Sequence, residues 1–212
     1  KWEEYFYISP PTEKRIQKKI KGKMLTLTIE DTLAKNTTYN IALNNCIKDN
    51  NEGNIVDTLS FIFSTYDKID SLTLSGKLQD AYTLNAVENA WIMLFVNNRG
   101  DSIIFKEKPN YIAKTNENGD FHFPNLKSKN YTIVSLTDFD FIYNEEEKIA
   151  FLNTTVNAKR DSFISLLSFD PIIAIDSIIK DSTLVEVDST TADSLVVEEI
   201  KYGNLTIIST EN

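Results

Sequence analysis

Hydrophobic and polar residues alternate with a period of two along most of the chain, and the period of a helix is hard to find. Around residues 24–29, Leu25, Leu27 and Ile29 are separated by threonines, and residues 37–43 repeat the pattern with Tyr39 and Ile41. Such alternation is typical of strands that cover a core with one face. Further short runs rich in β-branched or aromatic residues follow at 59–64, 71–78, 91–96, 120–123, 131–136 and 163–169. Turn-forming residues bound each run, so the sequence predicts an all-β fold of tandem β-sandwiches.

Two polar breaks divide this pattern into three parts. A strand-like run ends in the sequence FSTYDK, a new alternating run begins at Ile69, and a second break lies at residues 157–161. A length of 212 residues also favours two domains with a tail. We therefore expect domains at residues 1–67 and 68–159, followed at 160–212 by an acidic, Asp-Ser/Thr-rich linker and the start of a further β element. The Val and Ile content of this tail leaves strand formation open, whereas its charge favours an extended linker.

The charge of the chain is concentrated in that tail. The net charge is −9, and residues 161–212 hold ten carboxylates against two lysines. A basic cluster near the start is interpreted as a solvated strand or loop; it comprises Lys14, Arg15, Lys18, Lys19, Lys21 and Lys23. Because phosphate contacts need clustered cations on an accessible face, an acidic chain is not expected to bind nucleic acid. No apolar run approaches the roughly 20 residues of a membrane-spanning helix.

The residue types needed for most catalytic and metal chemistry are scarce. One Cys and one His exclude a disulfide framework and a Cys/His zinc site, and they leave little scope for a histidine-based triad. Phosphate-binding loops and nucleophile elbows are also missing from the sequence. We therefore expect no cofactor and no enzymatic activity. The enzyme hypothesis that stays open uses a carboxylate pair, such as Asp138 with Glu145, as acid and base.

An acidic cluster near the end of the second domain is the one candidate metal site. Calcium prefers six to eight oxygen ligands on a flexible loop, and such oxygens are offered by Asp138, Asp140, Asn144 and Glu145. Phe139, Phe141 and Ile142 stand where small turn-forming residues would help a calcium loop to fold. We interpret the cluster as a solvated acidic hairpin and expect calcium to matter little.

Residues 5–68 carry a combination of motifs that resembles a known domain. The marks are ISPP at residues 8–11, LAKNTTY at 33–39, the loop IKDNNEGN at 47–54 and FSTYD at 63–67. Together they resemble the bacterial Ig-like domain of surface-layer type, as found at the N-terminus of a family of Bacteroidota lipoproteins. The chain starts after the point where such a domain usually begins, so we expect its earliest strands, and any targeting segment, to lie outside this sequence.

The following stretch resembles a second common module. SLTLSGKLQDAYT, AWIMLF and TNENGDFHFPNLKSKNYTIVSL are similar to the carboxypeptidase-regulatory or prealbumin-like sandwich. In this hairpin we expect Gly119 to supply a positive φ and Phe121, Phe123 and Leu126 to form the buried face. Asn130, which tolerates the left-handed region, replaces the glycine usual in that module. Neither module is an enzyme in its familiar settings.

A triplet of Asp, Ser or Thr, and then an aliphatic residue or Thr, recurs eight times, against roughly one occurrence expected from composition. The triplet resembles the O-glycosylation acceptor that Bacteroidota use on exported proteins, although Asp-Ser/Thr pairs also favour turns. The candidate acceptors are Thr32, Thr58, Ser71, Ser177, Ser182, Ser189 and Ser194. The four in the tail would make it a glycosylated spacer.

These features predict a non-enzymatic, extracytoplasmic scaffold or docking protein. The resemblance implies a lipoprotein subunit of a cell-envelope complex at the outer membrane, the cell surface or the periplasmic face. Its expected partners are other envelope proteins, with a lipid anchor outside this chain as the only membrane attachment. The alternative is a carbohydrate- or peptide-binding surface module. We expect the contact at residues 91–96, placed near a sheet edge of the second sandwich, and secondarily at the loop 47–54, because an open strand edge invites a partner strand.

Overall fold

Strands joined by turns and loops make up the fold of the computed structural model, which describes residues 6–48, 52–56, 59–96, 101–137, 141, 143–144, 147–159 and 163–170. Within these ranges the only helix is the short 3-10 helix η2 (Asp101–Phe105). The predicted all-β class is therefore confirmed. The strands are β1 (Phe6–Ser9), β2 (Gln17–Lys21), β3 (Met24–Thr28), β4 (Thr38–Leu43), β5 (Ile47–Lys48), β6 (Ile55–Val56), β7 (Ser60–Ser64), β8 (Leu72–Asp80), β9 (Trp91–Val96), β10 (Tyr111–Lys114), β11 (Asp120–Leu126), β12 (Asn130–Leu136), β13 (Ile149–Phe151), β14 (Val156–Asn157) and β15 (Phe163–Ser168).

The first domain is built on an antiparallel sheet of order β1-β4-β7, with separate hairpins β2-β3 and β5-β6. Its core lies between the sheet and the β2-β3 hairpin. The predicted inward positions Tyr39, Ile41 and Leu43 are buried there, and Leu25 and Leu27 pack against them from the hairpin. The period-two reading of both segments is therefore confirmed.

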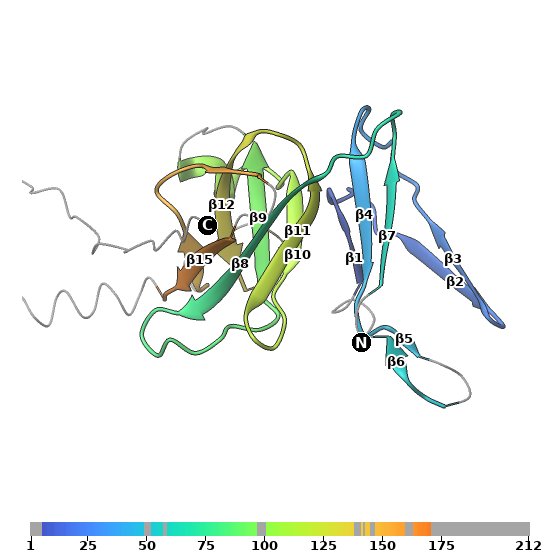
Figure 1. Ribbon diagram of the computed structural model, residues 1–212, viewed down its shortest axis with the longest axis horizontal. Helices are drawn as coiled ribbons and strands as arrows, with labels where there is room; N and C mark the ends of the chain where they lie inside the picture. Colours follow the sequence, from blue (N-terminus) through green and yellow to red (C-terminus); the bar gives the residue numbers. More distant parts are fainter. Residues whose placement is uncertain are drawn as a thin grey trace, which may run out of the picture.

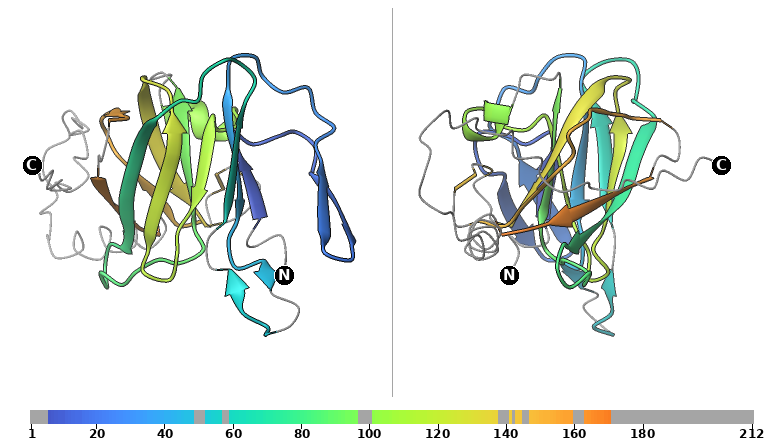
Figure 2. Two further views of the ribbon diagram at one scale, coloured as in Figure 1. Left: turned by 45° about the vertical axis from the view of Figure 1, so that its right-hand side comes forward. Right: turned by 90° about the vertical axis from the view of Figure 1, so that its left-hand side faces the viewer.

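Strand β4 is buried along its whole length, which its alternating sequence did not predict. Thr38, Asn40 and Ala42, on the face opposite the first-domain core, are all less than a tenth exposed. That face lies against the second domain, so the β1-β4-β7 sheet forms a layer between the β2-β3 hairpin and the second sandwich (Figure 1). The left view in Figure 2 shows the same succession of layers.

The second domain is a sandwich of two sheets. One has the order β10-β9-β12-β13, with β14 also paired to β12, and the other has the order β11-β8-β15. Large side chains fill the space between them, among them Leu74, Leu78, Phe123, Tyr131 and Ile133, each 1% exposed or less. At about 25 cal/mol per Å² of apolar surface, burial of this kind is the main source of stability.

The larger sheet is also covered on its outer face. Trp91, Met93 and Phe95 point away from the main core, and η2, Phe141 and Tyr143 pack over them. The Trp91 and Phe141 rings meet edge to face, with centroids 5.4 Å apart. A strand buried on both faces needs apolar residues at every position, which explains the uninterrupted WIMLFV run of β9.

The segment from the turn at Gly119 through β11 to the start of β12 has the predicted turn glycine and the predicted buried residues. It differs from the prediction in which asparagine takes the left-handed conformation. Gly119 has a φ of 75°, and a Cβ there would lie 2.4 Å from the Leu78 carbonyl oxygen, so glycine is required. Phe121, Phe123 and Leu126 are buried as predicted. The left-handed asparagine is Asn125, with a φ of 59°, and not Asn130, which begins β12.

The second domain extends further than the sequence indicated. Residues 163–168, which we assigned to the part after residue 159, form β15 and pair in parallel with β8, from Phe163 opposite Ser75 to Ser168 opposite Asp80. Leu166 is 1% exposed in the main core. Because Lys159 and Phe163 are separated by a polar break, the sequence alone gave no sign that the chain returns to the same sandwich. The tail beyond Asp170 lies outside the described residues.

A chain ending at Lys159 should therefore be less stable than one ending at Asp170. The shorter chain loses the parallel pairing of β8 and the burial of Leu166, a side chain whose truncation in a core typically costs about 2–5 kcal/mol. Urea unfolding of the two purified chains measures the difference. Equal free energies of unfolding would show that β15 is dispensable and that residue 159 is the true domain end.

Candidate functional site

The expected contact strand β9 is not at a sheet edge. It pairs with β10 on one side and with β12 on the other, through Leu94 opposite Tyr111 and Ile133 opposite Leu94. Its backbone groups are thus used within the sheet, and its side chains are buried on both faces. The prediction that residues 91–96 offer a docking edge was wrong, because a continuous apolar run marks an interior strand rather than an exposed one.

The neighbouring edge strand, β10, is covered by the first domain. The register of β10 with β9 directs the backbone N–H groups of Ile112 and Lys114 away from β9. Ser9 Oγ accepts the first at 3.0 Å, and the Tyr7 hydroxyl accepts the second. Burial raises the pKa of Tyr7 to about 12, so its hydroxyl keeps its proton at ordinary pH. Side chains of β1 therefore occupy the edge that would otherwise be open.

The opposite end of the sandwich is partly closed as well. Ile149 of β13 and Phe169, just after β15, exchange two backbone hydrogen bonds of 3.0 and 2.9 Å. This bridge joins the two sheets at that end, so β15 is not a free edge along its full length. The Phe151 and Phe169 rings contact each other beside it, with centroids 6.0 Å apart.

Asp70, in the connection between the domains, ties them together. Its carboxylate accepts hydrogen bonds from the Thr38 hydroxyl at 3.0 Å and the Tyr66 hydroxyl at 2.6 Å. Its backbone carbonyl accepts a hydrogen bond from Asn125 Nδ2 at 2.7 Å. The Asp70 carboxylate raises the pKa of Tyr66, chiefly through that hydrogen bond. One residue thus binds β4 of the first domain and β11 of the second, and hydrogen bonds to a charged group are stronger than neutral ones.

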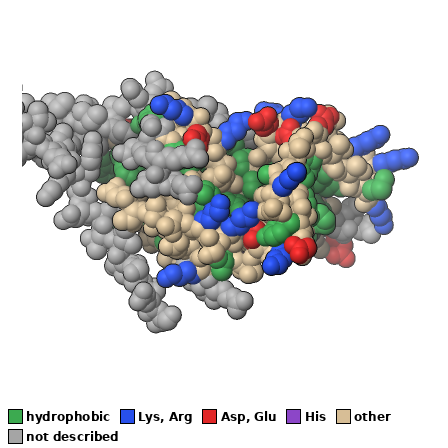
Figure 3. Space-filling view, turned by 90° about the horizontal axis from the view of Figure 1, so that it is seen from above, with side chains coloured by type: hydrophobic (Ala, Val, Ile, Leu, Met, Phe, Trp, Pro, Cys, Tyr) green, Lys and Arg blue, Asp and Glu red, His purple; other side chains and the backbone are tan. Residues whose placement is uncertain are grey.

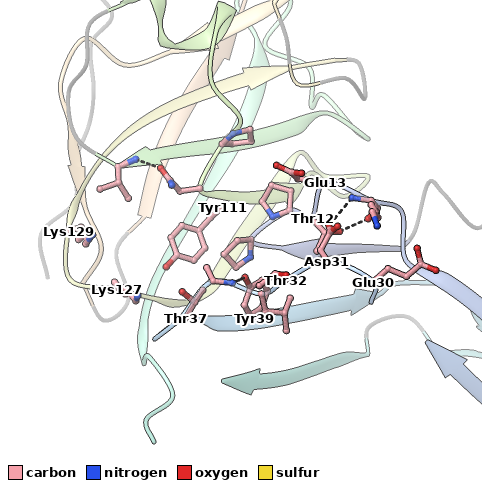
Figure 4. A pocket seen from close by; sticks show the side chains of 18 residues that line it. Thr12, Glu13, Glu30, Asp31, Thr32, Thr37, Tyr39, Tyr111, Lys127 and Lys129 are labelled. Carbon is pink, nitrogen blue, oxygen red and sulfur yellow. Dashed lines mark hydrogen bonds between the residues drawn. The ribbon is translucent and has the colours of Figure 1, made fainter. Parts of the chain in front are cut away.

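A cleft of about 660 Å³ lies where the two domains meet. Figure 4 shows Thr12, Glu13 and Asp31 of the first domain on one side, and Tyr111 with Lys127 and Lys129 of the second domain toward the other. Asp31 Oδ2 already accepts the Lys14 backbone N–H at 2.8 Å. Burial raises the pKa of Tyr111 to about 12, so this hydroxyl is neutral. The cleft offers polar hydroxyls, prolines and charges of both signs.

The edge of β7 is open in the part of the chain that the structure describes, where its strand partner is β4 alone. The Thr65 backbone N–H donates to the Thr37 carbonyl at 3.0 Å, which sets the alternation along the ladder. Odd-numbered residues of β7 therefore bond to β4, and Ser60 and Ile62 direct their N–H and C=O groups away from it. Those groups are positioned to pair with an added strand.

The side chains along β7 are apolar and exposed. Phe61 is 61% exposed, and Leu59 and Ile62 are also exposed. Phe61 continues the row of rings formed by Phe63 and Tyr39, with centroids 6.1 and 5.4 Å apart. The described part of this edge, from Leu59 to Ser64, carries no charged residue that would discourage pairing. The sequence signal is LSFIFS at residues 59–64, which places apolar residues on both faces of the strand. From the sequence alone we predict only a strand there.

The candidate loop 47–54 belongs to the β5-β6 hairpin, and residues 49–51 lie outside the described ranges. Ile47 pairs with Val56 and Lys48 with Ile55. Ile55 and Val56 are exposed and extend the apolar surface near the start of β7.

The candidate glycosylation acceptors divide into two groups. Thr32, which lines the mouth of the cleft, and Ser71, which precedes β8, are exposed. Thr58, Ser177, Ser182, Ser189 and Ser194 lie outside the described residues. Glycosylation therefore stays a prediction at every site, with Thr32 and Ser71 accessible to modification.

The candidate calcium cluster is mostly outside the described residues, which include only Asn144 of its four members. Asn144 donates its side-chain amide to Glu147 Oε2 at 2.9 Å and its backbone N–H to the same oxygen at 3.1 Å. Glu147 is buried. No group of three or more potential ligands occurs among the described side chains. Because Asp138, Asp140 and Glu145 are not among them, calcium binding and the Asp138–Glu145 acid-base pair stay untested hypotheses.

Replacing Asp70 by Ala should weaken the junction between the domains. The substitution leaves the buried Thr38 hydroxyl without its carboxylate partner, and we expect a loss of about 2–3 kcal/mol in the free energy of unfolding. The matched control is Asp67→Ala, which removes an exposed carboxylate from the same connection. Urea unfolding followed by tryptophan fluorescence measures both. If the two variants unfold alike, Asp70 does not hold the domains together.

Comparison with known proteins supports the first domain and is silent on the second. Searches of curated proteins and of solved structures gave no significant match. A family model described as bacterial Ig-like domain matches residues 2–65, a range that spans β1 to β7. Such domains are commonly extracellular or surface-exposed and typically non-catalytic. The prealbumin-like resemblance of the second domain stays a prediction, whereas the match at residues 2–65 supports the resemblance of the first domain to a bacterial Ig-like domain.

Proposed function

We propose that this chain is a non-enzymatic docking or scaffold protein, and that the edge of β7 in its Ig-like domain is the contact for an extended segment of another envelope protein. The observation that carries the proposal is the open, uncharged and apolar β7 edge beside a sandwich whose nearest edge is already covered. Main-chain hydrogen bonds to an added strand supply affinity, and side-chain pockets supply specificity.

The chemistry at β7 fits an added strand better than a flat contact. Ser60 and Ile62 offer outward N–H and C=O groups at a spacing of two residues, which matches the repeat of a partner strand. Phe61 and Leu59 lie on the face shared with the first-domain core, so an apolar residue of the partner would extend that core.

The outer membrane of Bacteroidota is the proposed location, with a lipoprotein anchor outside this sequence. The proposal rests on the resemblance of residues 5–68 and agrees with the common surface exposure of bacterial Ig-like domains. Among the described residues, no helix has the length and apolarity to cross a bilayer.

The interdomain cleft supports a second candidate function, the binding of a carbohydrate or a short peptide. Its lining includes Pro10 and Pro11 together with the accessible rims of Tyr39 and Tyr111, whose rings are otherwise buried in the two domain cores. Lys127 and Lys129 at one side could pair with a carboxylate. We rank this function second because Lys127 already donates to the Asn36 carbonyl and lies over the Tyr66 ring.

We also propose O-glycosylation at the Asp-Ser/Thr triplets. The four tail triplets would add hydrated bulk to an acidic segment and separate the two domains from their attachment point. Thr32 is exposed at the cleft, so a glycan there would lie beside any ligand of that cleft.

The docking proposal predicts that Ile62→Pro abolishes partner binding while leaving the domain folded. Proline removes an N–H that points away from β4, so the β4-β7 ladder keeps its hydrogen bonds. The matched control is Ile62→Thr, which keeps that N–H and is β-branched. Each full-length protein is extracted gently from its native membrane, cross-linked and analysed by mass spectrometry for its partner.

We expect at least about tenfold less cross-linked partner for Ile62→Pro and near-normal recovery for Ile62→Thr, since an added strand needs the backbone group more than the side chain. Thermal unfolding checks that both variants are folded. Partner recovery that is unchanged by the proline, or the absence of any partner under gentle extraction, would contradict docking at β7.

The glycosylation proposal predicts added mass on the native protein. Changing Ser177, Ser182, Ser189 and Ser194 together to Ala should remove most of it, and Thr32→Ala should remove a further increment. Ser128→Ala, an exposed serine outside the triplets, is the control. Intact mass spectrometry measures each species, and a native mass equal to that of the unmodified chain would refute the proposal.

A further inference from the structure

The β2-β3 hairpin projects from the first domain on the side away from the second (Figures 1 and 2). All five residues of β2 are exposed. Its register closes at Lys21 opposite Met24, and Gly22, with a φ of 61°, makes the two-residue turn. No described atom beyond its chain neighbours lies within 4 Å of a Cβ placed on Gly22, so this turn residue faces open space.

The outer half of the hairpin carries a positive charge that no acidic side chain among the described residues pairs with. Lys19, Lys21 and Lys23 lie at or beside the tip, and residues 14–29 contain no carboxylate. Within the described ranges, these three lysines take part in no ion pair. The nearest acidic residues in the sequence, Glu13, Glu30 and Asp31, flank the base of the hairpin, where Asp31 accepts the Lys14 backbone N–H.

Two large apolar side chains flank the same turn. Ile20 is 66% exposed and Met24 is 60% exposed. Ile20 pairs with Leu25, whereas Met24 pairs with Lys21, so the two apolar side chains lie on opposite faces of the hairpin. At the right-hand end of Figure 3, basic side chains surround a hydrophobic one. A surface approached tip first would contact both apolar side chains and the three lysines together.

We propose that the tip of the β2-β3 hairpin is a binding site for an anionic lipid bilayer. Exposed lysines are attracted to anionic headgroups, and apolar side chains among them can insert at the headgroup boundary. The tip is a two-residue turn at the end of a projecting hairpin, which suits a flat, deformable surface better than an extended acidic peptide. This site is separate from the β7 edge and does not depend on the docking proposal.

The test uses the full chain and sedimentation with vesicles of phosphatidylcholine, with and without phosphatidylglycerol. Because each lysine near an anionic surface contributes about fivefold to partitioning, Lys19, Lys21 and Lys23 changed together to Gln should reduce binding about a hundredfold. The matched control changes Lys35, Lys106 and Lys108 to Gln, three exposed lysines elsewhere. Changing Ile20 and Met24 to Ser keeps the charge and should also weaken binding.

Support for the proposal is binding that requires phosphatidylglycerol, falls with salt, and is lost in the hairpin variants but kept in the control. Thermal unfolding of each variant confirms that it is folded. Equal binding to phosphatidylcholine alone, or an equal loss in the control, would overturn it. The proposal would also be overturned if the full chain bound a synthetic peptide of residues 181–200, the acidic segment of this chain, through the hairpin but bound no vesicles.

Discussion

Burial of the second face of β4 is the constraint on which the other features depend. Thr38, Asn40 and Ala42 are withdrawn from water by the second sandwich rather than by their own domain. That contact brings β1 beside β10, where Ser9 and Tyr7 accept the outward N–H groups of the second sheet. It also creates the cleft and leaves β7 as the uncovered end of the shared layer.

The junction between the domains contains a specific hydrogen-bond network and also two buried acceptors without a hydrogen-bond partner. Asp70 joins Thr38, Tyr66 and Asn125, whereas the buried Oδ1 atoms of Asn40 and Asn125 have no hydrogen-bond partner in the described structure. An unsatisfied buried acceptor typically costs about 1–3 kcal/mol. The apolar part of the contact is the edge-to-face pair of Tyr7 and Trp91, with centroids 5.4 Å apart. The polar bonds fix the relative orientation of the domains, and the apolar contacts around Trp91 add burial.

The alternation of apolar and polar residues was sufficient to predict the buried side chains of strands that bury one face. Leu25, Leu27 and Ile29 and the hairpin residues Phe121 and Phe123 were assigned correctly, because alternation reports directly on one buried face. The sequence predictions were less accurate for β9 and β4, the strands that are buried on both faces. WIMLFV was placed at an edge, although its continuous apolar character indicates an interior strand.

The polar positions of β4 carry no such signal. Thr38 is buried against the second domain with its hydroxyl bonded to Asp70, 32 residues away, and periodicity along the sequence does not report such a contact. The same holds for β15, whose parallel pairing with β8 depends on a long return of the chain. The uncharged sequence LSFIFS indicates in part that β7 can accept a partner strand. That its edge is open follows from the sheet order, in which β7 pairs with β4 alone among the described strands. The candidate site is therefore a property of the domain arrangement.

Amide hydrogen exchange by NMR tests this arrangement most directly, because it reports separately on the covered and the open edge. The account predicts slow exchange for Ile112, whose N–H is held by Ser9 Oγ, at a rate close to that of Ala113, whose N–H is directed toward β9. It predicts fast exchange for Ile62, which faces away from β4. Exchange of Ile112 as fast as that of Ile62 would show that the first domain does not cover the second and would contradict the account.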